Sequence, residues 1–415
     1  MPELDAAIAY LRSPLAIRAR CEHVLAAGIA GRLEHFAVEP DALKTVAGEV
    51  ARVTRAAYPD LRIPVHGRTN HFRAGGVDRV AAFDARLTAA GLSPDERART
   101  WVDLVVVSVL LDAGAGDAWR FREPGTGVVL GRSEGLAVAS LHAFEAGLFS
   151  SDPTRPLAAD ADGLGAVDPA RLAEVFQAGA DNPLAGLDGR IGLIRELGCA
   201  VAASPAIFPG GRPGGLVDSL RAARASADVD GEGIPAQELL RALLEGLAPI
   251  WPGRIELGGT NLGDVWRHHA AGGSGPSAGL VPFHKLSQWL AYSLFEPLER
   301  AGIPISQAGA LTGLPEYRNG GLLLDLGALV PRHDGVRGVV HAPGDEVIVE
   351  WRALTVALLD RVAALVQRAL GKTPAELPLA RVLEGGTWAA GRAVAAALRP
   401  GGGPPIRINS DGTVF

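Results

Sequence analysis

The sequence predicts a mainly α-helical protein with two helical lobes. Of its 415 residues, 48% are hydrophobic, many of them alanine, but only 5% are aromatic, which favours closely packed helices. Apolar residues recur at three- and four-residue steps in most segments, as expected of helices with one buried face. The 53 glycines and 29 prolines fall mainly between these segments, where they form turns and end helices.

Helix-start signals and turn residues place the individual elements. Ser13-Pro14 combines an N-cap residue with a first-turn proline, and Ser93 with Glu96 forms a capping box. The connection over residues 150–165 is polar and contains proline and aspartate. We therefore expect an N-terminal lobe over residues 1–150 and a C-terminal lobe over residues 151–415. The helices predicted cover residues 4–38 (broken at 13–14), 41–57, 93–112, 168–203 (broken near 183), 216–225, 235–247, 262–269, 282–298, 345–370, 374–383 and 387–398.

Residues 281–330 contain the most specific pattern of the chain. Pro282 suits the first position of a helix, and apolar residues form one face of that helix while Lys285 lies on another. We expect Pro297 to kink or shorten the last turn. A tight loop between Gly313 and Gly320 then carries a carboxylate, a phenol, a guanidinium and an amide, which suggests a site rather than a spacer. These loop residues are Glu316, Tyr317, Arg318 and Asn319.

Charge and cysteine content narrow the class of protein. The net charge of −6 and the lack of clustered positive charge make duplex DNA an unexpected partner. The two cysteines, Cys21 and Cys199, form no disulfide framework, which fits a reducing cytoplasm. The N-terminus shows no signal-peptide pattern, and the apolar run at residues 101–111 is too short to span a bilayer. We expect a cytoplasmic protein that binds neither nucleic acid nor membrane, and we leave its oligomeric state open.

Several common catalytic motifs are absent or weak. The sequence contains no phosphate-binding G-x-x-x-x-G-K-[ST] loop and no dinucleotide-binding G-x-G-x-x-G turn after a strand. His268 and His269 are adjacent and should point in different directions on a helix, so we expect no metal and no cofactor. G-x-S-x-G occurs around Ser133 and Ser277. A nucleophile elbow needs a strand before it and a helix after it. Ser277 lacks the strand, whereas the match at Ser133 stays open, although chance explains it better in a glycine-rich chain.

Two further segments concentrate polar groups. Residues 66–79 hold several histidines and arginines that could bind an anion or sugar hydroxyls, although composition alone favours a solvated loop. Asp112 ends an apolar helix at its negative dipole end, where a carboxylate needs a compensating donor or access to water. Trp119 follows closely among charged residues, as in the lining of a small-molecule site. Lys285 and Glu316 have the equally simple alternatives of a solvated helix face and a structural ion pair.

Four longer segments carry a resemblance to a known family. They are NHFRAGGVDR (70–79), FHKLSQWLAYSLFEPLE (283–299), LTGLPEYRNGGLLLDLG (311–327) and INSDGTVF (408–415). Over essentially its whole length the chain resembles the uracil-catabolism protein family, the fourth component of the ring-opening route of uracil degradation. The resemblance implies that the protein removes ribosylurea, or its 5′-phosphate, as urea plus a ribose species.

The chain is also similar, more distantly, to the queuosine-salvage N-glycosylases of the helical DNA-glycosylase-like superfamily. The matching landmarks are VSVLLDAGAGDAWRF (107–121), FHKLSQWL (283–290) and PEYRN (315–319), although the salvage enzymes commonly have Asp where this chain has Glu316. This similarity implies two helical lobes around a central cleft and an N-glycosidase mechanism. In that mechanism Glu316 and Lys285 are catalytic. The residues expected to contact the substrate are His71, Phe72, Arg73, Asp112, Asp117, Trp119, Tyr317, Arg318 and Asn319.

The roles expected of these groups follow from their chemistry. Glu316 would stabilise positive charge on the ribose ring and position or deprotonate water. Lys285 would keep Glu316 ionised, or donate to a substrate hydroxyl or to the departing urea. Arg73 and Arg318 would hold a 5′-phosphate if one is present. The alternatives are an amidohydrolase or ureidohydrolase acting on another intermediate, and a non-catalytic regulator that binds a nucleoside or nucleotide.

Overall fold

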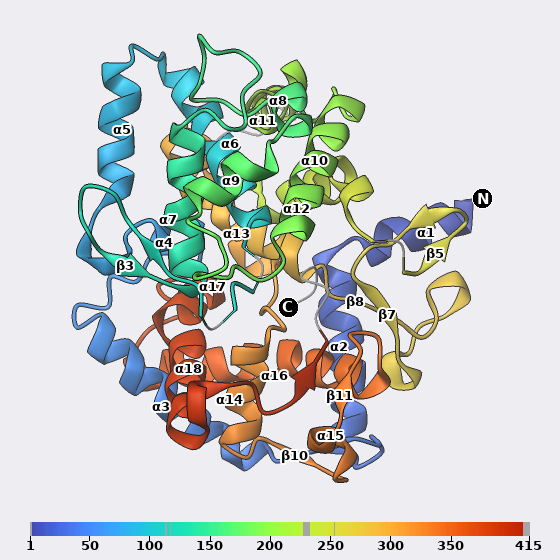
Figure 1. The fold of residues 1–415 in the computed structure, drawn as a ribbon. Coiled ribbons are helices and arrows are strands. Elements are labelled where there is room, and N and C mark those ends of the chain that lie inside the picture. The colour runs from blue at the N-terminus through green and yellow to red at the C-terminus, as the bar shows by residue number, and fades with distance from the viewer. Residues whose placement is uncertain (1, 113, 117, 227–232, 253, 410–415) are drawn as a thin grey trace. The chain divides into compact units, whose positions relative to one another are not determined.

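The computed structural model describes the chain except for residues 1, 113, 117, 227–232, 253 and 410–415. Helices make up most of it, and its short strands occur as two-stranded pairs, so the mainly α prediction is confirmed (Figure 1). The chain forms two compact units, each built from segments that are separate in the sequence. The first unit comprises Met1–His66, Pro252–Gln288 and Gln307–Phe415, and the second comprises Gly67–Trp251 and Trp289–Ser306.

The first unit is organised around the long helix α16 (Glu346–Leu370), most of which is buried. It packs against α2 (Pro14–Ile29), α3 (Leu43–Ala57) and α14 (Tyr317–Asp325), and α14 packs in turn against α18 (Trp388–Leu398), as Figure 1 shows. The predicted cap of α2 is confirmed, because Ser13 Oγ accepts a hydrogen bond of 3.2 Å from the backbone N–H of Ala16. The other helices of this unit are α1 (Pro2–Leu11), α15 (Gly335–Gly338), α17 (Leu379–Val382) and a π-helix at Leu383–Thr387.

The described part of the first unit contains four strand pairs, two of which join segments far apart in the sequence. Antiparallel pairs link β1 (Phe36–Val38) to β10 (Leu329–Pro331), and β7 (Val265–Arg267) to β8 (Leu280–Pro282). A third antiparallel pair consists of β5 (Glu256–Leu257) and β6 (Thr260–Asn261), and a parallel pair of β11 (Val340–His341) and β12 (Arg407–Ile408). The β11–β12 pair holds the segment around Ile406, which is fully buried.

The second unit is organised around the buried helix α6 (Pro94–Leu110). Its predicted N-cap is confirmed, because Ser93 Oγ accepts a hydrogen bond of 3.2 Å from the Glu96 N–H. Helix α6 packs against α7 (Arg132–Glu145), α10 (Leu187–Ala203) and α11 (Leu216–Ser226). The remaining elements are α4 (Arg68–His71), α5 (Arg79–Ala89), α8 (Ala161–Gly165), α9 (Pro169–Val175), α12 (Ala236–Gly246), and the pairs β2 (Phe121–Arg122) with β3 (Val129–Leu130) and β4 (Ile234–Pro235) with β9 (Ile305–Ser306).

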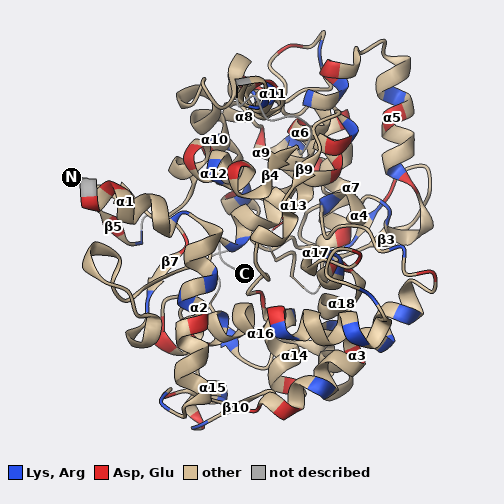
Figure 2. Cartoon of the chain, turned by 180° about the vertical axis from the view of Figure 1, so that it is seen from behind, with Lys and Arg blue, Asp and Glu red and all other residues tan. Residues whose placement is uncertain are grey.

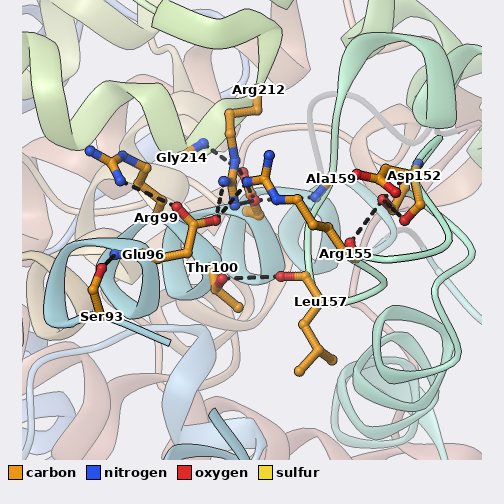
Figure 3. A network of polar contacts seen from close by, with 12 residues as sticks. Ser93, Glu96, Arg99, Thr100, Asp152, Arg155, Leu157, Ala159, Arg212 and Gly214 are labelled. Atoms are coloured by element: carbon orange, nitrogen blue, oxygen red, sulfur yellow. Dashed lines mark hydrogen bonds and ion pairs between the residues drawn. The ribbon is translucent and has the colours of Figure 1, made fainter. Parts of the chain in front are cut away.

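A hydrogen bond to the buried Asp103 and an exposed ion pair attach the connection over residues 150–165 to α6 (Figure 3). Asp103, fully buried on α6, accepts hydrogen bonds from the Ala159 N–H at 3.1 Å, the Gly214 N–H at 2.6 Å and Arg212 Nε at 3.0 Å. Arg155 also donates to Glu96 at 2.9 Å. The lobe boundary expected near residue 150 therefore lies inside the second unit. The proline and aspartate residues of this connection form capped turns that pack on α6. Such turns have the same amino-acid composition as a linker between domains, so composition alone does not distinguish the two.

Local structure differs from the prediction in four places. Residues 262–269 contain strand β7 instead of a short helix, since Val265–Arg267 pairs with β8. Pro282 ends β8, so helix α13 (Lys285–Arg300) begins three residues later than expected. Helix α13 also continues past Pro297 without ending there. Within residues 374–383 the α-helical part is α17 alone.

Charged residues of both signs lie along the helices (Figure 2). Helix α3, for example, carries Lys44, Glu49, Arg52 and Arg55. None of the helices in the described residues is long and apolar enough to cross a membrane.

We predict that Asp103→Ala lowers the free energy of unfolding by about 3–5 kcal/mol, because it removes one of the two carboxylates that pair with the buried Arg212 and leaves two backbone N–H groups without their acceptor. Guanidinium denaturation would measure the loss. Asp152→Ala is the control, since Asp152 caps an exposed turn of the same connection and its loss should leave the midpoint nearly unchanged. Equal midpoints for Asp103→Ala and the wild type would contradict the role of this network.

Candidate functional site

A single residue of the first unit fixes the start of helix α13. Asp264 accepts hydrogen bonds from three successive backbone N–H groups: its carbonyl oxygen from Phe283 at 2.9 Å and His284 at 3.4 Å, and its Oδ2 from Lys285 at 3.0 Å. His284 has φ of +47°, a conformation that non-glycine residues rarely adopt. The turn that Asp264 holds makes Lys285 the first residue of the helix.

The carboxylate of Asp264 is itself held by a buried arginine. Arg352 on α16 donates from both Nη atoms at 2.8 Å, and the indole N–H of Trp266 donates at 2.6 Å. Burial acts to raise the pKa of Asp264, but the charge and hydrogen bonds of Arg352 outweigh it and hold the pKa well below its ordinary range. The Arg352 guanidinium also lies 4.1 Å over the ring of Phe283. Asp264 is therefore a permanently charged anchor for the turn.

A buried amide joins the first turn of α13 to the segment that leads to α14. Gln288 Oε1 accepts a hydrogen bond of 2.9 Å from the Thr312 N–H, and Gln288 Nε2 donates to Thr312 Oγ1 at 2.9 Å and to the Phe283 carbonyl at 3.0 Å. Gln288 itself is fully buried. It ties residues near Lys285 to residues near Glu316.

Glu316 is the N-cap of helix α14. Its Oε2 accepts a hydrogen bond of 2.9 Å from the Arg318 N–H, and its Oε1 accepts one of 2.8 Å from the Asn319 N–H. Burial raises the pKa of Glu316 above its ordinary value of 4.5, although these two bonds and the positive charge of Lys285 act to lower it. The expected effect of Lys285 on Glu316 thus has the predicted sign, but burial is stronger.

The predicted loop after Gly313 is confirmed up to Glu316, but Tyr317, Arg318 and Asn319 form the first turn of α14. Arg318 Nη1 donates to the Gly402 carbonyl at 2.6 Å, and Asn319 Nδ2 donates to the Leu314 carbonyl at 3.1 Å. Two buried polar atoms, Arg318 Nε and Asn319 Oδ1, have no hydrogen-bond partner within the described part of the chain. Next to Glu316 there is thus one unsatisfied donor and one unsatisfied acceptor.

In the second unit, Asp112 pairs with a fully buried arginine. Arg68 Nη1 lies 2.8 Å from Asp112 Oδ2 and 3.2 Å from His71 Nδ1, and Arg68 Nε donates to Ser108 Oγ at 2.7 Å. The ring of His71 lies 5.8 Å from that of Trp289. A cation thus compensates the carboxylate at the end of α6, as the sequence argument required. Arg68 had not been singled out, since an arginine in a polar loop gives no sign of complete burial.

A second arginine closes the same helix end. Arg190 donates from Nε to the Leu111 carbonyl and from Nη2 to the Gly114 carbonyl, both at 3.0 Å. Burial lowers the pKa of Arg190 to about 10, and the charge of Arg68 acts in the same direction while that of Asp112 opposes it. These contacts satisfy carbonyl groups that the end of α6 leaves without helical partners.

Other predicted substrate contacts have structural partners in the second unit. Phe72 is 1% exposed, and Trp119 is fully buried with its indole N–H donating to the Phe176 carbonyl at 2.9 Å. Arg73 forms two hydrogen bonds with Glu296, of 2.6 and 3.1 Å, and the phosphate role suggested for it stays a prediction. Asp117 lies outside the described residues. Contact of these residues with a substrate stays a prediction.

His268 and His269 do not point apart as expected. His268 caps a short 3-10 helix, His269–Ala271, and the two rings stack with centroids 4.6 Å apart. With Glu346 they are the described side chains best arranged to hold a cation. The Ala270 N–H donates to His268 Nδ1 at 3.1 Å, however, so in the neutral ring Nε2 carries the proton and faces Glu350 at 3.3 Å. This arrangement fits a hydrogen-bonded pair better than a metal ligand.

The G-x-S-x-G matches do not form nucleophile elbows. Ser133 follows β3 and lies in the first turn of α7, but the residue with left-handed backbone is Arg132, at φ of +54°. In an elbow the nucleophile occupies the strained turn itself. Ser277 accepts a hydrogen bond of 2.9 Å from Arg20 and donates to the Ser274 carbonyl at 3.2 Å, which is a structural use.

Comparison with known proteins identifies close relatives. Residues 10–415 match the family described as "Protein of unknown function (DUF1688)". The chain is 40% identical over 413 residues to "Protein urg3" of Schizosaccharomyces pombe, covering 98% of this chain and 99% of the relative. It is 38% identical over 413 residues to "Uracil catabolism protein 4" of Lachancea kluyveri, covering 93% of each chain. The family resemblance predicted from the sequence is thus confirmed, while the more distant one to N-glycosylases stays a prediction.

We predict that Glu123 stabilises the second unit in a pH-dependent way. Burial acts to raise its pKa, but hydrogen bonds from Arg79, Thr126 and His142 outweigh burial and lower the pKa to about 2. The folded pKa lies below the unfolded one, so this stabilisation is present above about pH 4.5 and is lost as the pH falls towards 2. Denaturation of wild type and Glu123→Gln between pH 7 and 3 measures the difference. The two proteins should converge on acidification, and a constant gap would contradict the shift.

The Arg68–Asp112 pair can be tested as a stabilising unit of the second unit. Arg68→Met alone, or Asp112→Leu alone, should cost about 3–5 kcal/mol because each leaves one buried charge uncompensated. The double variant Arg68→Met/Asp112→Leu should recover much of that loss, as measured by guanidinium denaturation. Additive losses in the double variant would mean that the two side chains do not act as a pair.

Proposed function

Because the chain belongs to the DUF1688 family, with one relative named for uracil catabolism, we propose that it acts in uracil degradation as an N-glycosidase. The proposed reaction is hydrolysis of the C–N bond between ribose and urea in ribosylurea or its 5′-phosphate. One water molecule is consumed, and the products are urea and ribose or ribose phosphate.

The observation that carries the proposal is the buried carboxylate of Glu316 within the electrostatic reach of Lys285. Cleavage of a ribose C–N bond develops positive charge on the sugar ring, which a fixed carboxylate stabilises. Two backbone N–H groups orient Glu316, and each of its oxygens has a further lone pair for water or a sugar hydroxyl. Burial makes this carboxylate a stronger base than an exposed one, because it disfavours the charged form.

The proton balance assigns a complementary role to Lys285. Water attacks C1′ as the C–N bond breaks, and the bonding electrons move to the urea nitrogen. Glu316 accepts the proton that water loses, and the Lys285 ammonium donates a proton to the departing nitrogen. Arg318 Nε and Asn319 Oδ1 would supply a donor and an acceptor to sugar hydroxyls, which can both donate and accept.

Lysine is scarce in this protein, and that makes its position in α13 informative. Of the 40 basic residues only Lys44, Lys285 and Lys372 are lysine, and the other two lysines pair with acidic residues close by in the sequence. An ammonium gives up and regains its proton far more readily than a guanidinium. Because arginine forms most of the ion pairs in the described residues, a lysine in α13 offers a proton donor that an arginine would not.

The direct test is to incubate the purified protein with ribosylurea and with its 5′-phosphate and to assay urea. We predict release of urea from at least one of them, and no release from either would refute the proposal. Glu316→Gln should lower kcat by about 10²–10⁴-fold, because it removes the base and the charge that stabilises the sugar cation.

The same variant also changes a helix cap, which needs its own control. Asp168 caps α9 through a hydrogen bond of 2.9 Å from the Ala170 N–H, so Asp168→Asn reports the cost of an altered cap alone. It should leave kcat within about two-fold of the wild type, since single surface caps affect stability more than chemistry. If Glu316→Gln folds and binds ligand while the wild type shows no turnover, the protein is a binding regulator instead.

A further inference from the structure

The proposed reaction needs Lys285 to be held opposite Glu316, yet a lysine side chain is flexible and its helix begins with strained backbone. Without restraint, the left-handed conformation of His284 would relax, since such strain persists only where surrounding contacts enforce it. Relaxation would rotate the first turn of α13 and carry the ammonium away from Glu316. Something outside α13 must therefore fix this turn.

Asp264 has the contacts needed for that task. Its carbonyl and carboxylate accept the N–H groups of all three residues of the turn, Phe283 to Lys285, at 2.9–3.4 Å. Arg352 donates a hydrogen bond of 2.8 Å to each oxygen of the Asp264 carboxylate, and its guanidinium lies over the Phe283 ring. Both carboxylate oxygens of Asp264 accept hydrogen bonds from the protein, so Asp264 acts through its neighbours rather than on the substrate.

We propose that Asp264, locked in place by Arg352, is the positioning residue that sets the Lys285 ammonium against Glu316. The role of Lys285 in turnover rests on the proposed function, whereas the positioning itself does not. Three consequences follow from the contacts. The effect of Asp264 is transmitted through the backbone of residues 283–285, depends on the two-pronged geometry of Arg352, and disappears when Lys285 is absent.

The scarcity of lysine allows the positioning to be measured without turnover. In the variant Lys44→Arg/Lys372→Arg, reductive ¹³C-methylation labels Lys285 and the N-terminal amine, so the ¹H–¹³C spectrum reports Lys285 as one assignable signal. In this background Glu316→Gln should shift the Lys285 signal, because it removes a neighbouring charge. When Asp264→Asn is also present, the shift caused by Glu316→Gln should fall to less than about half, as expected of two coupled sites.

The matched control is Asp325→Asn. Asp325 lies on α14, the helix that Glu316 caps, and forms a two-pronged pair with Arg399 at 2.7 and 2.6 Å. It has no contact with residues 283–285 in the described structure. Asp325→Asn should leave the Lys285–Glu316 coupling unchanged although it breaks an equivalent ion pair. If Asp264→Asn does not fold, Arg352→Gln replaces it, since glutamine loses the two-pronged contact with Asp264 and adds no lysine to the labelled protein.

Activity provides the second readout. If urea is released by the wild type, Asp264→Asn should lower kcat by about 10²-fold with a much smaller change in KM, because misplacement of a catalytic group by about 1 Å has that effect. Lys285→Met should abolish any further effect of Asp264→Asn. An undiminished Glu316-dependent shift in folded Asp264→Asn would overturn the positioning role. Absence of urea release with diminished coupling would instead refute the proposed function alone.

Discussion

The ion pair between Arg352 and Asp264 is the interaction on which the first unit most depends. A buried charge is tolerated only when it is paired and hydrogen-bonded, so Arg352 on α16 requires a carboxylate and Asp264 requires the donors around it. The contacts that satisfy the Arg352 guanidinium and the Asp264 carboxylate join α16 to strand β7 and to the first turn of α13. The same constraint acts two residues earlier, where Glu350 accepts the N–H groups of His35 and Phe36 and fastens β1 to α16.

The second unit solves the same problem on α6. Asp103 accepts hydrogen bonds from Arg212 and from two backbone N–H groups. Ser108 accepts a hydrogen bond from Arg68, which in turn neutralises the charge of Asp112. In both units the central helix is buried almost all round, so it cannot be positioned by an amphipathic face alone. The few polar side chains of the central helix determine which segments pack around it. For each of them, only one arrangement of the neighbouring segments satisfies its hydrogen-bond donors and acceptors. Apolar packing then fills the space between.

Sequence reasoning predicts the helices well because their apolar period and cap residues are local signals. It fails where the deciding partner is distant. Residues 262–269 show a helical period, but their pairing with Leu280–Pro282 makes them a strand. The sequence from Glu316 to Asn319 is typical of a loop between glycines, because no local signal identifies Glu316 as the N-cap of helix α14. Asp264 was missed for a related reason: its importance comes from Arg352, 88 positions away in the chain. The scarcity of lysine was the available signal, and it points to Lys285 rather than to the residue that holds it.

In the proposed mechanism Glu316 would have two uses that constrain each other. As an N-cap it accepts hydrogen bonds from the first turn of α14, and this contact favours the ionised form. As the proposed base it would gain strength from burial, which disfavours that form. The cap would orient the carboxylate, while the positive charge of Lys285, positioned by Asp264 as proposed, would oppose the effect of burial on the pKa of Glu316.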